Sequence, residues 1–280
     1  MQAGYERAWR RWDAVAVVGI AGWLLFDLTA RAMFGSVPWP HSAVDYRILY
    51  DSGRHVFETH QYPAGYPYPP PAAAVHAASA VLPFSVAASL WLALTGVAAG
   101  SIYLCLARVL GLHRRPGGLV LLPLAYALVA YYFQWDVRSV NCNLVVLATV
   151  VFGCAALVRG RDAGAGFMFA ASVALKLFPV LVLPYLAWAR RWRALGWAVS
   201  FSAVFWGAVP AVVYGVGGTG DVYRGWADEL TRATDPATKA VHPILISLDK
   251  AAAHLAAGDA GRARGITLGV CAAWVLVGLA

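Results

Sequence analysis

Long apolar runs alternate with short polar segments along the chain. The runs at 85–107, 117–134 and 194–220 contain no Asp, Glu, Lys or Arg. Each approaches or exceeds the roughly 18–20 residues that a helix needs to cross a bilayer. The run at 14–34, which follows three arginines, and the shorter run at 144–158 fit the same pattern. The chain is therefore predicted to be all-α, a polytopic transmembrane helical bundle.

Composition supports this class, because the 280 residues are 60% hydrophobic and only 13% charged. Soluble domains carry about 25% charged residues. The net charge of +8 does not indicate nucleic acid, because the cations sit at the ends of apolar runs, as cytoplasmic topology determinants do. These groups are Arg7/Arg10/Arg11, Arg108/Arg114/Arg115, Arg159/Arg161 and Arg190/Arg191/Arg193.

The positive-inside rule gives a topology for the loops. With the first arginines inside, the segment after the first span is a first outer loop. The apolar stretch 71–83 is too short to cross easily, and we expect it to be re-entrant. Segments 134–143 and 215–243 then become outer loops, and 265–280 begins another span after a surface helix at 244–257.

The apolar segment 163–189 is interrupted by Lys176 and Pro179. Arginines flank it on both sides, which favours two short arms that start and end inside and meet at Lys176. Each arm is about 20 Å long at 1.5 Å per residue. Irregular backbone at that depth must line protein or water, so the pattern predicts a recessed cavity open to the outside.

The first outer loop, 39–71, is rich in aromatic and polar residues. Between Val44 and Phe57 the pattern, with Ile48 and Leu49, predicts an amphipathic juxtamembrane helix lying on the membrane. The following run of tyrosines and prolines cannot be helical, because each proline pushes the residue before it to an extended conformation. It is expected to form a stiff turn.

Three acids in this loop are candidate general bases: Asp45, Asp51 and Glu58. A carboxylate can deprotonate an incoming hydroxyl when held within hydrogen-bond reach. Each could equally be a solvated or arginine-paired surface acid.

Lys176 is one of only three lysines, and it alone lies between two apolar arms. A cation at that depth indicates a functional site, with snorkelling to the interface as the alternative. The functional interpretation is a counter-charge for a phosphate, a role that needs several donors. Further candidates for the same contact are Arg47, Arg54, Arg138, His242 and Tyr68.

A series of short motifs follows in order along residues 14–250. After the acid at 45 come Tyr66-Pro67-Tyr68-Pro69-Pro70, Asn141-Cys142-Asn143-Leu144, Arg159-Gly160-Arg161, Ala174-Leu175-Lys176-Leu177-Phe178-Pro179 and Arg190-Arg191-Trp192-Arg193. This series resembles the family 87 glycosyltransferases of the GT-C class, which include a mycobacterial α-1,2-mannosyltransferase of phosphatidylinositol mannoside synthesis.

The resemblance implies a single glycosyltransferase domain over 1–280 in a bacterial plasma membrane, with its active site outside. Such enzymes move a sugar, typically mannose, from a polyprenyl-phosphate donor to a lipid or glycan acceptor, with inversion. Their base is an aspartate of the first outer loop, which corresponds to Asp45 here. Lys176 and His242 are assigned to the lipid phosphate by position and charge. Neither a cofactor nor a metal is expected.

The chain departs from this family in two respects. Members commonly have Gly-Gln-x-Asn where this chain has Val140-Asn141-Cys142-Asn143. They are also commonly longer, so C-terminal spans are expected to be missing. Two other functions stay open. A transporter or flippase predicts internal repeats and charges spread along a path. A non-catalytic membrane scaffold of the same fold would need no base.

Overall fold

The computed structural model describes residues 43–114, 118, 120–121, 124–125 and 135–234. This part of the chain is helical and contains no strand. The expected first span, most of 117–133, the surface helix at 244–257, the span at 265–280 and His242 lie outside the described residues. The chain divides into two compact units, 1–229 and 230–280, and the second is described only at 230–234.

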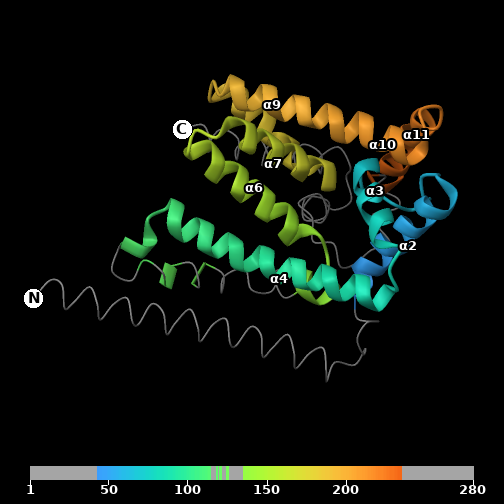
Figure 1. Ribbon diagram of the computed structural model, residues 1–280, viewed down its shortest axis with the longest axis horizontal. Coiled ribbons are helices and arrows are strands. Elements are labelled where there is room, and N and C mark those ends of the chain that lie inside the picture. Colours follow the sequence, from blue (N-terminus) through green and yellow to red (C-terminus); the bar gives the residue numbers. More distant parts are fainter. Residues whose placement is uncertain (1–42, 115–117, 119, 122–123, 126–134, 235–280) are drawn as a thin grey trace, which may run out of the picture. The chain divides into compact units, whose positions relative to one another are not determined.

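Four apolar helices form the bundle of the first unit: α4 (Phe84–Val109), α6 (Asn143–Val158), α7 (Asp162–Leu175) and α9 (Trp192–Ala203). They run side by side, with α7 packed on α6 and α9, and α4 packed on α6 (Figure 1). Small residues permit the close approach. A Cβ on Gly166 of α7 would lie 2.5 Å from the Trp197 Cβ of α9, so only glycine fits there.

Two helical stretches among the described residues are long and apolar enough to cross a membrane, Phe84–Val109 and Trp192–Tyr214. They confirm the helices expected for the runs at 85–107 and 194–214. The second stretch comprises α9, a π-helical turn at Val204–Ala208 and α10 (Val209–Tyr214). Apolar side chains such as Val97 and Val212 are exposed on these stretches, as contact with lipid requires.

The predicted break at Lys176 is confirmed. Helix α7 ends at Leu175, and Lys176 is extended, with φ −154° and ψ 134°. A short 3-10 turn, η2 (Phe178–Leu181), leads into α8 (Val182–Trp188). Both arms are too short to cross a bilayer alone.

The segment predicted as the first outer loop contains helix α2 (Val44–Thr59), which packs on α3 (Pro70–Ser79) in the apolar stretch that follows. Helix α3 begins within the proline run, so the prediction that the run is non-helical is wrong for Pro70 and Pro71. Their fixed φ angles and missing N–H groups suit the first turn of a helix. The 10 residues of α3 confirm that 71–83 contains no complete span. Gly53 lets α2 approach α3 closely, because a Cβ there would lie 2.3 Å from the His76 carbonyl carbon.

The amphipathic pattern predicted for α2 is only partly right. Its buried face consists of Tyr46, Leu49, Tyr50, Gly53 and Val56, which pack against protein. The two tyrosines can be buried because their rings are apolar and their hydroxyls are hydrogen-bonded. The Tyr46 hydroxyl donates to Ser79, and the Tyr50 hydroxyl donates to the Leu82 carbonyl at 2.6 Å. The apolar residues left exposed are Val44, Ile48 and Phe57.

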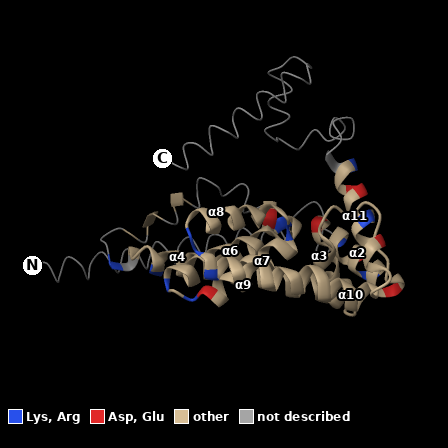
Figure 2. Cartoon of the chain, turned by 90° about the horizontal axis from the view of Figure 1, so that it is seen from above, with Lys and Arg blue, Asp and Glu red and all other residues tan. Residues whose placement is uncertain are grey.

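The predicted outer loop at 215–243 contains a helix that the sequence reasoning did not expect, α11 (Thr219–Thr234). Its residues follow a clear amphipathic helical period, so the sequence carried a signal for this helix. Figure 2 shows mainly Lys and Arg at the end of the bundle where α4 and α6 finish and α9 begins, a region that also holds the 3-10 turn η1 (Leu112–Arg114). Charges of both signs lie on α2 and α11.

Candidate active site

Asp45 lies in the first turn of α2, half-buried at the side of the bundle where α6 begins. Its Oδ2 accepts a hydrogen bond of 2.8 Å from the Asn141 Nδ2. The Asn141 Oδ1 in turn accepts the Cys142 N–H at 2.7 Å. A carboxylate only accepts and an amide N–H only donates, so both contacts agree on one orientation of the Asn141 amide. The described residues give Asp45 Oδ1 no hydrogen bond.

A second acid, Asp136, contacts the residues that follow Cys142 and is only 5% exposed. Its Oδ1 accepts the Asn143 Nδ2 at 2.6 Å, and its Oδ2 accepts the Leu144 N–H at 3.1 Å. The Asn143 Oδ1 accepts a hydrogen bond from the Lys176 Nζ. The segment 141–144 therefore connects Asp45 to Lys176 through two asparagine side chains.

Tyr68, in the aromatic turn before α3, completes the cluster. The Lys176 Nζ lies 5.5 Å from the centroid of its ring, a cation–π distance. Burial raises the pKa of Tyr68, so its hydroxyl stays protonated at physiological pH. The turn is held by the Tyr62 hydroxyl, which donates to the carbonyls of Tyr66 and Tyr68 at 2.5 and 2.6 Å.

The charges of the cluster act on one another. Burial raises the pKa of Asp136, whereas the bonds from Asn143 and Leu144 and the charge of Lys176 oppose that rise. Burial raises the pKa of the Cys142 thiol to about 11, so this thiol is a packed neutral group.

The backbone between Asp136 and α6 is shaped by an unusual residue. A helical turn over 135–139 ends at Val140, whose φ of 56° lies in the left-handed region. The Asn141 N–H closes this turn on the Asp136 carbonyl at 2.9 Å. Valine rarely adopts this conformation, and such strain concentrates at functional sites. After this turn of the backbone, Asn141 contacts Asp45 and Asn143 contacts Asp136.

The structure thus brings together three of the predicted site residues, Asp45, Lys176 and Tyr68. It places Arg47 elsewhere, with its guanidinium carbon 4.1 Å from the centroid of the Phe84 ring. Two residues correspond to about 200° around a helix, which explains why Arg47 points away from Asp45. Arg138 is exposed, and His242 lies outside the described residues.

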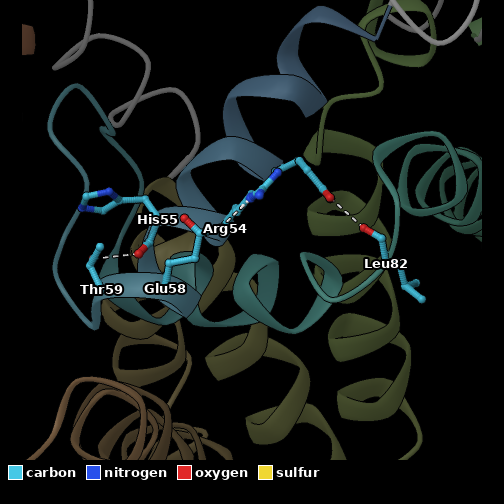
Figure 3. A network of polar contacts seen from close by, with 6 residues as sticks. Arg54, His55, Glu58, Thr59 and Leu82 are labelled. Carbon is cyan, nitrogen blue, oxygen red and sulfur yellow. Dashed lines mark hydrogen bonds and ion pairs between the residues drawn. The ribbon is translucent and has the colours of Figure 1, made fainter.

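Arg54 is also on the far side of α2 from Asp45, since nine residues correspond to about 180° around the axis. Its Nε donates to Glu58 at 2.7 Å, and both side chains are more than half exposed. Figure 3 shows this pair along α2 beside the Thr59 bond to the His55 carbonyl. Glu58 is therefore an arginine-paired surface acid, and Asp51 is exposed.

Sequence reasoning missed Asp136. It follows directly after Trp135 in the segment assigned to an outer loop, and it shares that loop with Asn141 and Asn143. An acid so close to an apolar run is a signal comparable to that of Lys176. The recessed cavity expected around Lys176 stays a prediction.

The described helices thus bring an acid, Asp45, and a half-buried lysine, Lys176, to one segment, 141–144. The model of glycosyltransferase family 87 matches residues 66–280. The chain therefore belongs to glycosyltransferase family 87. The match includes Tyr68, Asp136 and Lys176 and begins after Asp45. Neither the curated proteins nor the solved structures include a significant match.

Proposed function

We propose that this glycosyltransferase moves a sugar, mannose by the family resemblance, from a polyprenyl-phosphate donor to a hydroxyl of a lipid or glycan acceptor. The transfer inverts the anomeric carbon and takes place at the outer face of a bacterial plasma membrane. The observation that carries the proposal is a pair of hydrogen bonds, from Asn141 to Asp45 and from Lys176 to Asn143, which hold the acid and the lysine to the same short segment.

Asp45 is the proposed general base. The bond from Asn141 holds its Oδ2, so the other oxygen is the one that faces an incoming hydroxyl. The acceptor oxygen attacks C1 of the sugar as its proton passes to the Asp45 carboxylate. The bond from C1 to the phosphate oxygen breaks, and the polyprenyl phosphate leaves with the electron pair.

Lys176 is the proposed partner of the phosphate. Negative charge grows on the leaving oxygen, and a fixed cation stabilises that charge more in a site shielded from water than in bulk solvent. The face of Tyr68 and the Asn143 oxygen hold the ammonium group in place. The mechanism assigns no step to a metal ion.

Two observations support a polytopic protein with its site outside. The stretches Phe84–Val109 and Trp192–Tyr214 are suited to spanning. The arginines after α4, after α6 and before α9 lie at the helix ends away from the Asp45 cluster, which the positive-inside rule assigns to the cytoplasm.

The test is a transfer assay with the purified protein in lipid nanodiscs. Radiolabelled polyprenyl-phosphate mannose and GDP-mannose are supplied in parallel with a membrane-lipid extract as acceptor, with EDTA or with added Mg²⁺. We expect labelled glycolipid only from the polyprenyl donor, and equally in EDTA. Transfer from GDP-mannose alone, or none from either donor, would contradict the proposal.

A further inference from the structure

Asp136 accepts two hydrogen bonds that serve different groups. One comes from the side chain of Asn143 at 2.6 Å, and the other comes from the backbone of Leu144 at 3.1 Å. Both oxygens are hydrogen-bonded and the residue is only 5% exposed, so the carboxylate is buried. A buried carboxylate without a function would be costly, because burial disfavours its charged form.

The contacts of Asn143 fix which way its amide points. Its Nδ2 faces a carboxylate, which has only acceptors, and its Oδ1 faces the Lys176 ammonium, which has only donors. A flipped amide would set oxygen against oxygen on one side and nitrogen against ammonium on the other. The orientation of the Asn143 amide therefore depends on Asp136.

We propose that Asp136 is a positioning residue: it orients the Asn143 amide, which holds the Lys176 ammonium over Tyr68 to receive an anionic phosphate headgroup. This inference rests on the proposed function, since it takes the phosphate of the donor as the ligand. Asp136 touches neither the sugar nor the phosphate. It acts on them through Asn143 and Lys176.

A simpler role would be to cap α6, because the Leu144 N–H belongs to the first turn of that helix. The two roles separate on replacement by asparagine. An Asp136→Asn side chain keeps one oxygen for the Leu144 N–H, so the cap survives. Its amide nitrogen then faces the Asn143 Nδ2, donor against donor, and the Asn143 amide loses its orientation.

The exchanged pair restores every contact. In the double variant Asp136→Asn/Asn143→Asp, the new amide at 136 accepts the Leu144 N–H and donates to the new carboxylate at 143. That carboxylate accepts Lys176 with its second oxygen. The single change Asn143→Asp instead sets two carboxylates against each other. The net charge of the double variant equals that of the wild type.

The experiment measures binding of farnesyl phosphate in nanodiscs, with farnesol as the uncharged control. All proteins carry Asp45→Asn, so that the charge of the proposed base contributes neither to the measured affinity nor to its pH dependence. We expect Asp136→Asn to lower the affinity for farnesyl phosphate roughly tenfold or more, which corresponds to the loss of one charge-assisted hydrogen bond. The affinity for farnesol should stay unchanged. The double variant should recover most of the loss. Asp51→Asn, on the exposed side of α2, is the matched control.

Unchanged farnesyl phosphate affinity in Asp136→Asn would overturn the inference, and so would a double variant no better than the single one. An equal loss of farnesol would overturn it too, because it would indicate general collapse. These results differ from a failure of the proposed function, in which the parent protein with Asp136 intact does not bind farnesyl phosphate and the wild type transfers no sugar. That result would remove both claims together.

Discussion

At the scale of single residues, Asn141 is the contact on which the proposed base depends. Its side-chain amide donates to Asp45 Oδ2 at 2.8 Å. Val140, in the left-handed conformation, turns the backbone immediately before it. The contact therefore holds one oxygen of the acid and leaves the other for an acceptor hydroxyl.

Asn141→Ala should lower the rate of sugar transfer roughly 10- to 100-fold, because the Asp45 carboxylate loses the group that orients it. Affinity for farnesyl phosphate should change little, since Lys176 is held separately by Asn143. Asn141→Gln should recover part of the rate. Single-turnover transfer and equilibrium binding measure the two quantities, and an unaltered rate in the alanine variant would contradict the role.

Asp136 gives the site a pH dependence of predictable sign. Burial raises its pKa, so protonation begins at a higher pH than for an exposed aspartate, whose pKa is about 4. A protonated carboxyl turns one acceptor into a donor, as Asp136→Asn does. Farnesyl phosphate affinity is therefore present above the raised pKa and lost as the pH falls through it.

Binding isotherms from pH 7.5 down to 5 in the Asp45→Asn protein check this expectation. The same titration with Asp136→Asn added records the protonation of the phosphate itself, which is common to both proteins. We expect the steeper loss of affinity in the protein that keeps Asp136. Parallel curves would show that Asp136 does not control the lysine.

At the scale of elements, the sequence predicted what hydrophobic length and proline placement determine. The helices at 84–109 and 143–158 and the break at Lys176 follow from such local signals. Helix α11 was not predicted. Its position depends on contacts of Trp226 and Tyr223 with residues distant in sequence. The Trp226 indole donates to the Pro67 carbonyl at 3.3 Å, and the Tyr223 hydroxyl donates to the Trp206 carbonyl.

The Trp206 carbonyl lacks the usual helical donor for its hydrogen bond. It lies four residues before Pro210, which has no N–H to donate to it within the helix. The π-helical turn at Val204–Ala208 lies at the same place. Helix α11 thus joins this irregular turn to the aromatic turn that presents Tyr68, a link between segments far apart in sequence that no local pattern contains.

Packing of α2 on α3 sets the position of Asp45 and gives a prediction for Gly53. Gly53→Ala would set a Cβ 2.3 Å from the His76 carbonyl carbon, so α2 must shift. We expect a loss of roughly 1–3 kcal/mol in unfolding free energy together with reduced transfer. Thermal unfolding in detergent and the transfer assay measure both.

Gly96→Ala on α4 is the matched control, because nothing lies within 4 Å of the added Cβ. It should leave both stability and transfer at or above the wild-type values, since alanine favours helix more than glycine does. Equal behaviour of the two variants would mean that the contact between α2 and α3 is not tight.

At the scale of the whole molecule, which residues meet in the site could only be partly predicted. Charge and position selected Asp45 and Lys176, because a polar group beside a long apolar run is conspicuous. Arg47 and Arg54 were selected by the same reasoning, but helix geometry turns both away from Asp45. Asp136 also lies beside an apolar run, but its partners are amides and a backbone N–H, so no oppositely charged residue in the sequence points to its role.

The proposed orientation in the membrane rests on the arginine-rich helix ends, and cysteine labelling tests it. In a background without native cysteines, Ala64→Cys in the exposed aromatic turn should react with an impermeant maleimide in intact cells. Arg159→Cys, exposed after α6, should react only after the membrane is permeabilised. The reverse pattern would place the site in the cytoplasm.

The most direct test of the account compares Asp45→Asn with Asp51→Asn in single-turnover transfer from polyprenyl-phosphate mannose, with both proteins folded in nanodiscs. Both changes remove one carboxylate from α2, but only Asp45 is bound by Asn141. Loss of a general base predicts a fall of roughly 10²- to 10⁴-fold for Asp45→Asn, and none for Asp51→Asn. Transfer by Asp45→Asn at the wild-type rate would contradict the assignment of the base.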